Sequence, residues 1–151
     1  MTVPLMARIR DRLALTVVCR IRRQILMRVW KMDIREGSII SRSAKLDKTN
    51  PRGVHIGKYT VVAFGAAILT HDWVNNRFRD VHIGDNCFIG AHAIILPGVT
   101  IGDHCIVSTA SVVARDVPAG SLVAGNPARV VEKNIETTRY GVRSSQANRV
   151  T

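Results

Sequence analysis

The stretch "IGDNCFIGAHAIILPGVTIGDHCIVSTASVVARDVP", residues 83–118, places an aliphatic side chain at every sixth position. The same period runs through residues 34–50 and 56–73, and two insertions separate the three runs. The lead residues of the units are Ile34, Ile40, Leu46, Ile56, Val62, Ile68, Ile83, Ile89, Ile95, Ile101, Val107 and Val113. A short fixed period is typical of repeat proteins, in which each unit buries apolar side chains against its neighbours.

Two other positions of each unit also follow a pattern. The fourth residue after the lead is mostly small, and the second is often glycine or another small residue, as at Gly57, Gly84 and Gly102. Glycine adopts backbone angles that larger residues avoid, so it suits tight corners. We therefore expect each unit to form a short strand and a corner, with three units closing one triangular coil around an aliphatic column.

The two insertions differ in length. Leu46 and Ile56 are ten positions apart instead of six, and Ile68 and Ile83 are fifteen apart, which leaves four and nine extra residues. The longer insertion predicts a loop at about residues 74–82, directly after "ILTHDW" (68–73). Loops on a rigid scaffold are common places for functional sites.

His71 is the first catalytic candidate. Its place in the unit led by Ile68 is a corner position, so we expect its ring to project outward beside the loop. An imidazole titrates near neutral pH and can take a proton from an attacking hydroxyl or amine. A solvated surface histidine is the alternative. His82, near the end of the same insertion, is the reserve candidate.

The run from "ILTHDW" to "GNPARVVEK" (125–133) resembles the hexapeptide-repeat acetyltransferases. It is most similar to their sugar O-acetyltransferase branch, which includes maltose, galactoside, nodulation-factor and surface-polysaccharide acetyltransferases. The resemblance implies an all-β fold, a left-handed parallel β-helix over residues 34–131, since the period alone does not give the handedness. It also implies a homotrimer with active sites between subunits, acetyl-CoA as acyl donor, no metal ion, and His71 as general base for a sugar hydroxyl.

The resemblance further implies an acceptor that is a sugar or a lipid-linked saccharide of surface-polysaccharide or glycolipid synthesis. The substrate-binding candidates beside His71 are Asp72, Trp73, Asn75 and Asn76. Asp72 could equally bond its own backbone, as corner aspartates do, and the aromatic and amide side chains could serve loop packing. Family members also carry an Asn or acidic residue from an earlier coil opposite the histidine, where "VVAFGA" (61–66) offers nothing polar.

The donor site is expected around "AGNPARV" (124–130), because arginine and lysine bind the phosphates of CoA well. Its candidates are Gly125, Asn126, Pro127, Arg129 and Lys133, and C-terminal capping is the alternative role for this turn. The resemblance adds Phe88, Ala91, Thr109, Ala114 and Arg115. Phe88 and Ala114 depart from the family pattern, which often has Trp and Thr at these places.

Residues 1–33 read as a basic helical segment, with eight Lys or Arg and one acid, Asp11, between positions 8 and 31. Such a helix can lie on an anionic membrane or pack on the coil end or a neighbouring subunit. Nucleic acid is not expected as a partner, because no stacking aromatics alternate with the cations. The run "GSLVAGNPARVVEK" (120–133) is expected to form a closing strand and a short basic helix. Residues 132–151 are expected to hold the C-terminal helix and a tail, "TTRYGVRSSQANRVT" (137–151), that is disordered because it has little to bury.

The composition sets wider limits. A formal charge of +11 favours anionic partners, and three cysteines without CxxC spacing favour a reducing cytoplasm. The longest early apolar run, residues 13–19, is far short of the ~20 residues of a membrane span, so we expect neither a signal peptide nor a transmembrane helix. We expect a cytoplasmic protein, peripheral at the inner face of the membrane if the basic segment binds lipid.

Three other functions stay open on this scaffold. One is N-acylation of an amino sugar or another amine. A second is the zinc carbonic-anhydrase branch of the same fold, which is disfavoured because His71, His82 and His92 do not include the expected pair five residues apart. The third is a non-catalytic β-helix assembly protein, which would need neither His71 at a loop nor the "GNPAR" turn.

Overall fold

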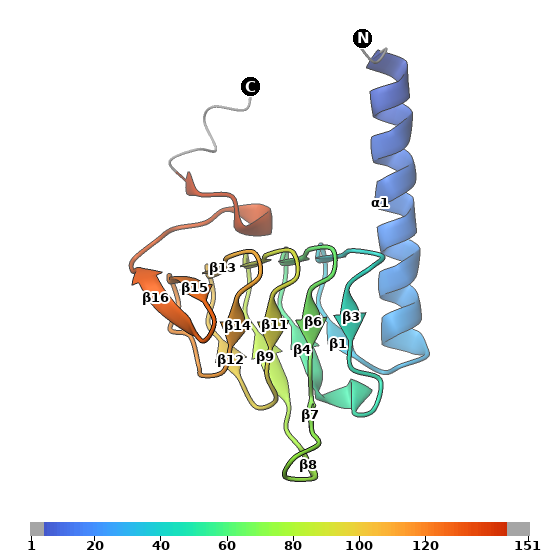
Figure 1. Ribbon diagram of the computed structural model, residues 1–151. Coiled ribbons are helices and arrows are strands. Elements are labelled where there is room, and N and C mark those ends of the chain that lie inside the picture. Colours follow the sequence, from blue (N-terminus) through green and yellow to red (C-terminus); the bar gives the residue numbers. More distant parts are fainter. Residues whose placement is uncertain (1–4, 145–151) are drawn as a thin grey trace.

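The computed structural model describes residues 5–144, with side chains from residue 17 onward. Three parallel sheets wrap around a common axis, and Figure 1 shows their short strands stacked side by side as successive rungs. The first face contains β1 (Asp33–Ile34), β4 (Val54–Ile56), β9 (Val81–Ile83) and β12 (Thr100–Ile101). The predicted parallel β-helix is therefore confirmed.

The other two faces complete the triangle. The second face contains β2 (Ile39–Ile40), β5 (Val61–Val62), β10 (Phe88–Ile89), β13 (Ile106–Val107) and β15 (Leu122–Gly125). The third contains β3 (Lys45–Leu46), β6 (Ala67–Ile68), β11 (Ile94–Ile95) and β14 (Val112–Val113). A short 3₁₀ helix, η1 (Pro51–Gly53), occupies the four-residue insertion before β4.

The predicted period appears in the register of the parallel ladders within the repeat. Lead residues pair with lead residues, as in Ile34 with Ile56 and Ile95 with Val113. These aliphatic side chains fill the inside of the coil, and most have less than 2 % of their surface exposed. At the corners, small residues such as Ala66 and Cys87 are fully buried. Because successive strand residues point to opposite faces, the residues beside the lead positions point outward.

One corner shows why glycine is needed. Gly65 has a φ of +68°, and a Cβ at this position would overlap the ring of His92 from the next coil. Any side chain here would meet both a strained backbone and a steric clash. The close stacking of successive corners depends on this glycine.

Helix α1 (Leu5–Arg28) covers the first rung of the coil (Figure 1). Leu26 is buried, and Met27 and Trp30 pack against the same core. Arg22 and Arg23 donate hydrogen bonds to the carbonyls of Ala44 and Ile34, 2.7 and 2.9 Å away. One face of the basic segment thus packs on the coil end, which was one of its two expected roles.

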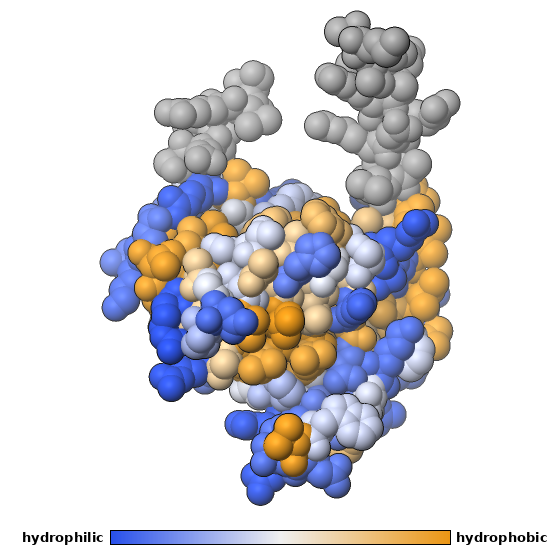
Figure 2. Space-filling model, viewed as in Figure 1, coloured by the Kyte–Doolittle hydropathy of each residue, from blue (hydrophilic) through white to orange (hydrophobic). Residues whose placement is uncertain are grey.

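The opposite face of α1 is apolar and exposed. Figure 2 shows this surface at the edge of the molecule, and its residues are Val17, Val18, Ile21 and Ile25 of α1 and Val29 just after the helix. The spacing of four between most of them places them along one stripe. Across the residues that the structure describes, no helix has both the length and the apolar character of a membrane span.

The nine-residue insertion forms a hairpin that projects from the coil (Figure 1). It pairs β7 (His71–Asp72) with β8 (Arg77–Phe78) in antiparallel fashion. The expected loop at residues 74–82 was misplaced at both ends. The hairpin begins at His71, and residues 81 and 82 already belong to β9, because Val81 is fully buried in the column.

The C-terminal segment also differs from expectation. Instead of a short helix, residues 128–132 form β16 (Ala128–Glu132), which pairs antiparallel with β15. The chain reverses at the Asn126–Pro127 turn, and the returning strand satisfies the edge groups of β15 that a helix would leave unpaired. Between β16 and residue 143, the helical element of the described chain is a 3₁₀ turn, η2 (Arg139–Gly141).

The segment after β16 is ordered as far as residue 144. Ile135 and Thr137 are buried, and the Thr137 hydroxyl donates a hydrogen bond to the carbonyl of Asn86 at 2.7 Å. His104 Nδ1 lies 2.9 Å from the Thr137 carbonyl, and the Tyr140 backbone N–H donates to the carbonyl of Tyr59. The expectation of a disordered tail was therefore wrong for residues 137–144, and residues 145–151 lie outside the described part.

Candidate active site

His71 is the first residue of β7, where the chain leaves the coil. The expected outward, solvated ring is not observed, because the residue is only 8 % exposed. Its ring lies between two aromatic rings of the same hairpin, with centroids 4.4 Å from Trp73 and 4.8 Å from Phe78. Phe78 is its direct partner across the hairpin, and Trp73 follows two positions later on the same side. The hairpin itself removes the imidazole from solvent.

Both ring nitrogens of His71 are buried without a hydrogen-bond partner in the described structure. A buried polar atom left unpaired costs roughly 1–3 kcal/mol, and buried polar groups in folded proteins are nearly always paired. Folding therefore leaves the His71 nitrogens unpaired within the described structure, and Trp73 or Phe78 would have to move for a group from outside the chain to reach them.

The backbone of His71 is held by Asp47, which follows β3 in the preceding coil. Asp47 Oδ2 accepts hydrogen bonds from the backbone N–H groups of Thr70 and His71, both at 3.0 Å, and Oδ1 accepts one from Thr49. Partial burial raises the pKa of Asp47, but the hydrogen bonds from Thr49, Thr70 and His71 outweigh it, so the net pKa is below its usual value. The carboxylate fixes the point at which the hairpin begins.

Asp47 is a polar residue of an earlier coil that the sequence analysis did not name, and it contacts the His71 backbone rather than the ring. A polar residue was sought in residues 61–66, which lie in the same coil as His71. The preceding coil instead lies against Thr70 and His71 with residues 46–50, "LDKTN". The Asn50 carbonyl of this segment accepts a hydrogen bond from the Thr70 hydroxyl at 2.8 Å. The available signal was the position of Asp47 one place after a lead residue, at the start of the four-residue insertion.

Asp72 stabilises the turn of the hairpin. Its carboxylate accepts hydrogen bonds from the backbone and the side-chain amide of Asn75, at 3.1 and 2.7 Å. These two bonds lower the pKa of Asp72. The other substrate-binding candidates lie on the same turn. Trp73 is 77 % exposed, and Asn76 adopts a positive φ of 49°. The structure thus brings all four candidates together on the hairpin that carries His71.

The reserve candidate, His82, lies elsewhere. It points outward from β9 on the first face, and its ring stacks on that of His55 with centroids 4.3 Å apart. Asp80 ends the hairpin just before β9, and its carboxylate Oδ2 is 3.8 Å from His55 Nε2. Sequence reasoning noted that His82 lies near the end of an insertion, but it did not predict that the register of β4 and β9 places it beside His55.

Several donor-site candidates line one long edge of the coil, between the second and third faces. The Ala110 N–H donates to the Ala91 carbonyl at 2.8 Å, so the corner after β13 stacks directly on the corner after β10. At the end of β15, the Gly125 N–H donates to the Ser111 hydroxyl at 3.2 Å. The edge therefore collects the predicted residues Ala91, Thr109, Gly125, Asn126 and Pro127.

The remaining donor-site candidates lie apart from that edge. Ala114 and Arg115 follow β14, on the edge between the third and first faces from which the hairpin also projects. Phe88 lies on the second face, where Gly141 of the C-terminal segment packs directly on its backbone. Arg129, on β16, is exposed close to the Asn126–Pro127 turn, whereas Lys133 is exposed beyond the far end of β16. The predicted donor residues therefore do not gather in one place on this chain.

A triangular parallel coil with six-residue rungs is the architecture of hexapeptide-repeat proteins. Residues 80–115 match the family model described as bacterial transferase hexapeptide (six repeats). The resemblance noted in the sequence is thus confirmed for the repeat region. The chain is also similar to YvoF of Bacillus subtilis, 31 % identical over 83 residues, covering 54 % of this chain and 48 % of YvoF.

A second curated relative is the protein CapG of Staphylococcus aureus. It is 42 % identical over 98 residues, covering 58 % of this chain and 56 % of CapG. The chain spans about half the length of the curated relatives it matches.

Solved structures confirm the left-handed parallel β-helix. A hexapeptide-repeat acetyltransferase from Vibrio cholerae superposes with a TM-score of 0.60 at 21 % identity, covering 77 % of this chain and 81 % of that one. A galactoside acetyltransferase in complex with coenzyme A superposes with a TM-score of 0.59 at 22 % identity, covering 75 % and 70 %. At these identities the likeness concerns the fold.

Proposed function

We propose that this chain is an acetyl-CoA-dependent O-acetyltransferase that transfers an acetyl group to a sugar hydroxyl, with His71 as general base. The observation that carries the proposal is the state of the His71 ring. It is buried between Trp73 and Phe78, and neither of its nitrogens has a partner. A buried imidazole kept free of internal hydrogen bonds is suited to receive a proton from a bound acceptor.

His71 acts on the acceptor in a single direct transfer. It accepts the hydroxyl proton as the acceptor oxygen forms its bond to the acetyl carbon, and it returns that proton to the departing sulfur as the carbon–sulfur bond breaks. Acetyl-CoA supplies the activated thioester. Asp47 holds the His71 backbone in place during this step, and the step asks for no metal ion.

The acceptor site is proposed to be the exposed side of the hairpin. Trp73 offers a flat apolar surface for a sugar ring, and Asn76 offers an amide for its hydroxyls. Asp72 and Asn75 are hydrogen-bonded to each other and stabilise the turn, so we propose that they support this surface. A saccharide or lipid-linked saccharide of surface-polysaccharide or glycolipid synthesis is the proposed acceptor class, and we place the reaction in the cytoplasm.

The donor is proposed to bind along the edge that contains Ala91, Thr109 and Gly125. The residues there fit CoA in two respects. The Gly125 backbone is open, because a Cβ added at this position would meet no atom closer than 3.6 Å. The exposed cation Arg129 lies close to the same turn and can bind phosphate groups, and Lys133 adds a second exposed cation at the far end of β16.

The position of this edge supports a homotrimer with shared sites. His71 projects from the edge between the third and first faces, whereas the donor residues line the edge between the second and third. One chain therefore presents the base and the donor groove on different edges. A neighbouring subunit that places its donor edge against this hairpin would bring the two together. Light scattering after size exclusion tests the trimer, and a monomeric mass would contradict it.

Thiol release from acetyl-CoA tests the activity. The assay uses a panel of sugars and amino sugars with the wild-type protein and with His71→Ala. We expect the variant to lose about 10²- to 10⁴-fold in turnover, while acetyl-CoA binding measured by calorimetry is retained. His82→Ala is the matched control and should keep its turnover. Equal turnover of His71→Ala and wild type would refute the base assignment and direct attention to His82.

The same panel separates the alternatives. An acceptor that reacts only when it carries a free amine would assign N-acylation, which the same base can support. If no acceptor stimulates thiol release and acetyl-CoA does not bind, the chain is a non-catalytic assembly protein.

We also propose that the exposed stripe of α1 contacts an anionic membrane surface. Val17, Ile21 and Ile25 lie along the helix face opposite the coil, and Arg20 and Arg28 add cations to the same helix. Sedimentation with liposomes that contain anionic lipid should pellet the wild type more strongly than an Ile21→Asp, Ile25→Asp variant. Equal pelleting would contradict membrane contact and assign the stripe to a neighbouring subunit.

A further inference from the structure

The first face of the coil carries an outward column of polar residues. In-register pairing aligns Asp33 on β1, His55 on β4, His82 on β9 and Thr100 on β12. The residues that follow them in each strand are the buried lead isoleucines, so these four side chains point away from the core. An open hollow of about 470 Å³ runs along this face and is lined in part by Asp33, His55 and His82.

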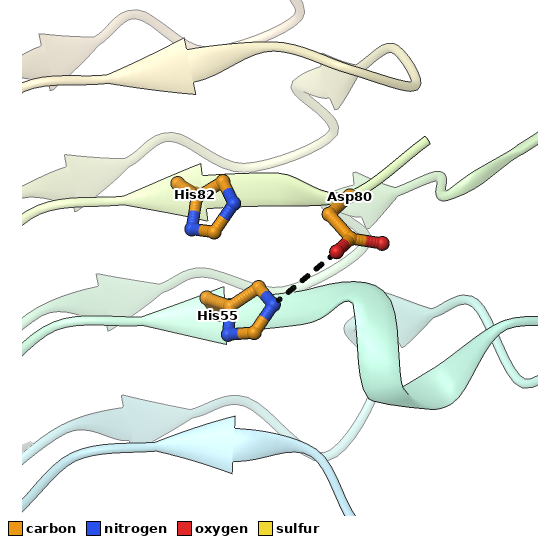
Figure 3. Close-up of side chains that lie close together, drawn as sticks. All are labelled: His55, Asp80 and His82. Carbon is orange, nitrogen blue, oxygen red and sulfur yellow. Dashed lines mark ion pairs between the residues drawn. The ribbon is translucent and has the colours of Figure 1, made fainter. Parts of the chain in front are cut away.

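His55 lies between two carboxylates. Its Nδ1 is 3.3 Å from Asp33 Oδ2, and its Nε2 is 3.8 Å from Asp80 Oδ2. The second separation is too long for a direct hydrogen bond. A metal ion placed between the two atoms, with a bond of about 2.0–2.2 Å to each, would fit this separation. Figure 3 shows the Asp80 carboxylate facing this nitrogen, with the His82 ring above His55.

We propose that His55, His82 and Asp80 form a binding site for a divalent transition metal, with Zn²⁺ as the best fit. The ligand atoms of these three residues all lie within 4.8 Å of one another. Two imidazoles and one carboxylate are a donor set that zinc prefers. The site is separate from the proposed acyl transfer and does not depend on it.

Asp33 is placed to orient the ring of His55. Metal-binding histidines usually donate their second ring N–H to a carboxylate, which fixes the tautomer and the ring orientation. Asp33 Oδ2 can accept a hydrogen from His55 Nδ1 in this way, which leaves the Nε2 lone pair directed to the side of Asp80. Asp80 is itself held, because its Oδ1 accepts a hydrogen bond from the Asn50 side chain at 3.4 Å.

Metal binding requires one local adjustment. The His55 and His82 rings are nearly parallel, with planes 8° apart, so their in-plane lone pairs do not converge. His82 is exposed, and rotation about its side-chain torsions can turn a ring nitrogen to the metal. The result is a three-ligand site with a fourth position open to water.

The metal would tie the hairpin to the coil. Asp80 is the last residue before β9, at the end of the hairpin that begins with His71. A metal bond between Asp80 and His55 would join the returning strand of the hairpin to β4. The exposed residues Arg77 and Arg79 should then become less accessible to trypsin.

The direct test is titration of the full chain, first stripped with a chelator, with Zn²⁺ by calorimetry and with Co²⁺ by visible absorption. We expect one ion per chain, tetrahedral cobalt bands, a higher unfolding temperature, and slower tryptic cleavage in the hairpin. Mg²⁺ should produce none of these effects. His55→Ala and His82→Ala should each abolish the cobalt bands, and Asp33→Ala should weaken zinc binding about 10- to 100-fold.

His92→Asn serves as the matched control, because it removes an exposed histidine outside the cluster and asparagine tolerates the positive φ of this corner. It should bind zinc as the wild type does. Absence of saturable binding to the wild type would overturn the proposal, and so would binding that persists in the His55→Ala, His82→Ala double variant. Because the readouts are metal content and stability, a failure here is distinguishable from a failure of the proposed acyl transfer.

Discussion

Asp47 Oδ2 lies 3.0 Å from the backbone nitrogen of His71, and this hydrogen bond joins two coils at the point where the hairpin departs. The same oxygen receives the N–H of Thr70. A single carboxylate thus fixes two consecutive peptide groups, and with them the direction in which the His71 side chain leaves the backbone.

Replacing Asp47 with asparagine should destabilise the protein. Asp47→Asn keeps the size of the side chain but removes its charge, and charge-assisted hydrogen bonds are stronger than neutral ones. We expect a loss of about 1–3 kcal/mol in the free energy of unfolding at pH 7, allowing for the partial exposure of the group. Urea unfolding followed by circular dichroism measures the difference.

The pH dependence gives a check on this interpretation. The folded-state pKa of Asp47 is depressed, so its charge contributes full stability above the unfolded pKa of about 3.9, and this contribution is lost as pH falls through the lower folded value. The stability difference between wild type and Asp47→Asn should be constant from pH 7 to about pH 5 and should shrink below about pH 4. A difference independent of pH would contradict the role of the charge.

His71→Phe should stabilise the fold while abolishing transfer. The substitution keeps a flat ring between Trp73 and Phe78 and removes two buried nitrogens that have no partner. We expect a gain of about 1–2 kcal/mol, because unpaired buried polar atoms carry an uncompensated desolvation cost. Thermal unfolding measures this gain. A lower unfolding temperature would mean that the imidazole is hydrogen-bonded in solution.

Gly141→Ala should release the C-terminal segment from the coil. Gly141 has a φ of +69°, and an added Cβ would overlap the backbone and Cβ of Phe88. We expect a loss of roughly 1–3 kcal/mol from the strained backbone and the steric clash. Tryptic cleavage at Arg139 and Arg143 should become faster. Unchanged cleavage would show that the packing of this segment on Phe88 does not limit its opening.

The three cysteines should differ in reactivity. Cys87 and Cys105 are fully buried, and a hydrogen bond to Cys105 together with burial raises the pKa of the Cys87 thiol. Cys19 on α1 is half-buried. Iodoacetamide should therefore modify only Cys19 in the native protein and all three cysteines after denaturation. Native labelling of Cys87 would indicate local opening of the corner between β9 and β10.

The period of six predicted the coil because it reports directly on which side chains point inward. Ile83 and Ile101 are buried in register, as their spacing of three six-residue units requires. The period carries no information where the chain leaves the coil. The burial of His71 depends on Trp73 and Phe78, whose positions in a hairpin arise from pairing within the insertion. This is why the sequence located His71 but predicted a solvated ring.

The remaining differences have a similar physical origin. Arg129 and Lys133 suggested a basic helix, but the open edge of β15 favours a paired strand over local helix propensity. The stacking of His55 on His82 depends on ladder register across a nine-residue insertion. The roles assigned to Asp72, Arg115 and the other site residues stay predictions, and the experiments above test those that carry the chemistry.

The way the coil ends also affects the behaviour of the protein at high concentration. Identical rungs present identical strand edges, and a bare edge is a template on which another chain can add its own strand. Here α1 lies over the first rung, and β16 turns back along β15 in the antiparallel direction. Loss of α1 or of β16 should expose a strand edge and allow chains to associate end to end into a fibre.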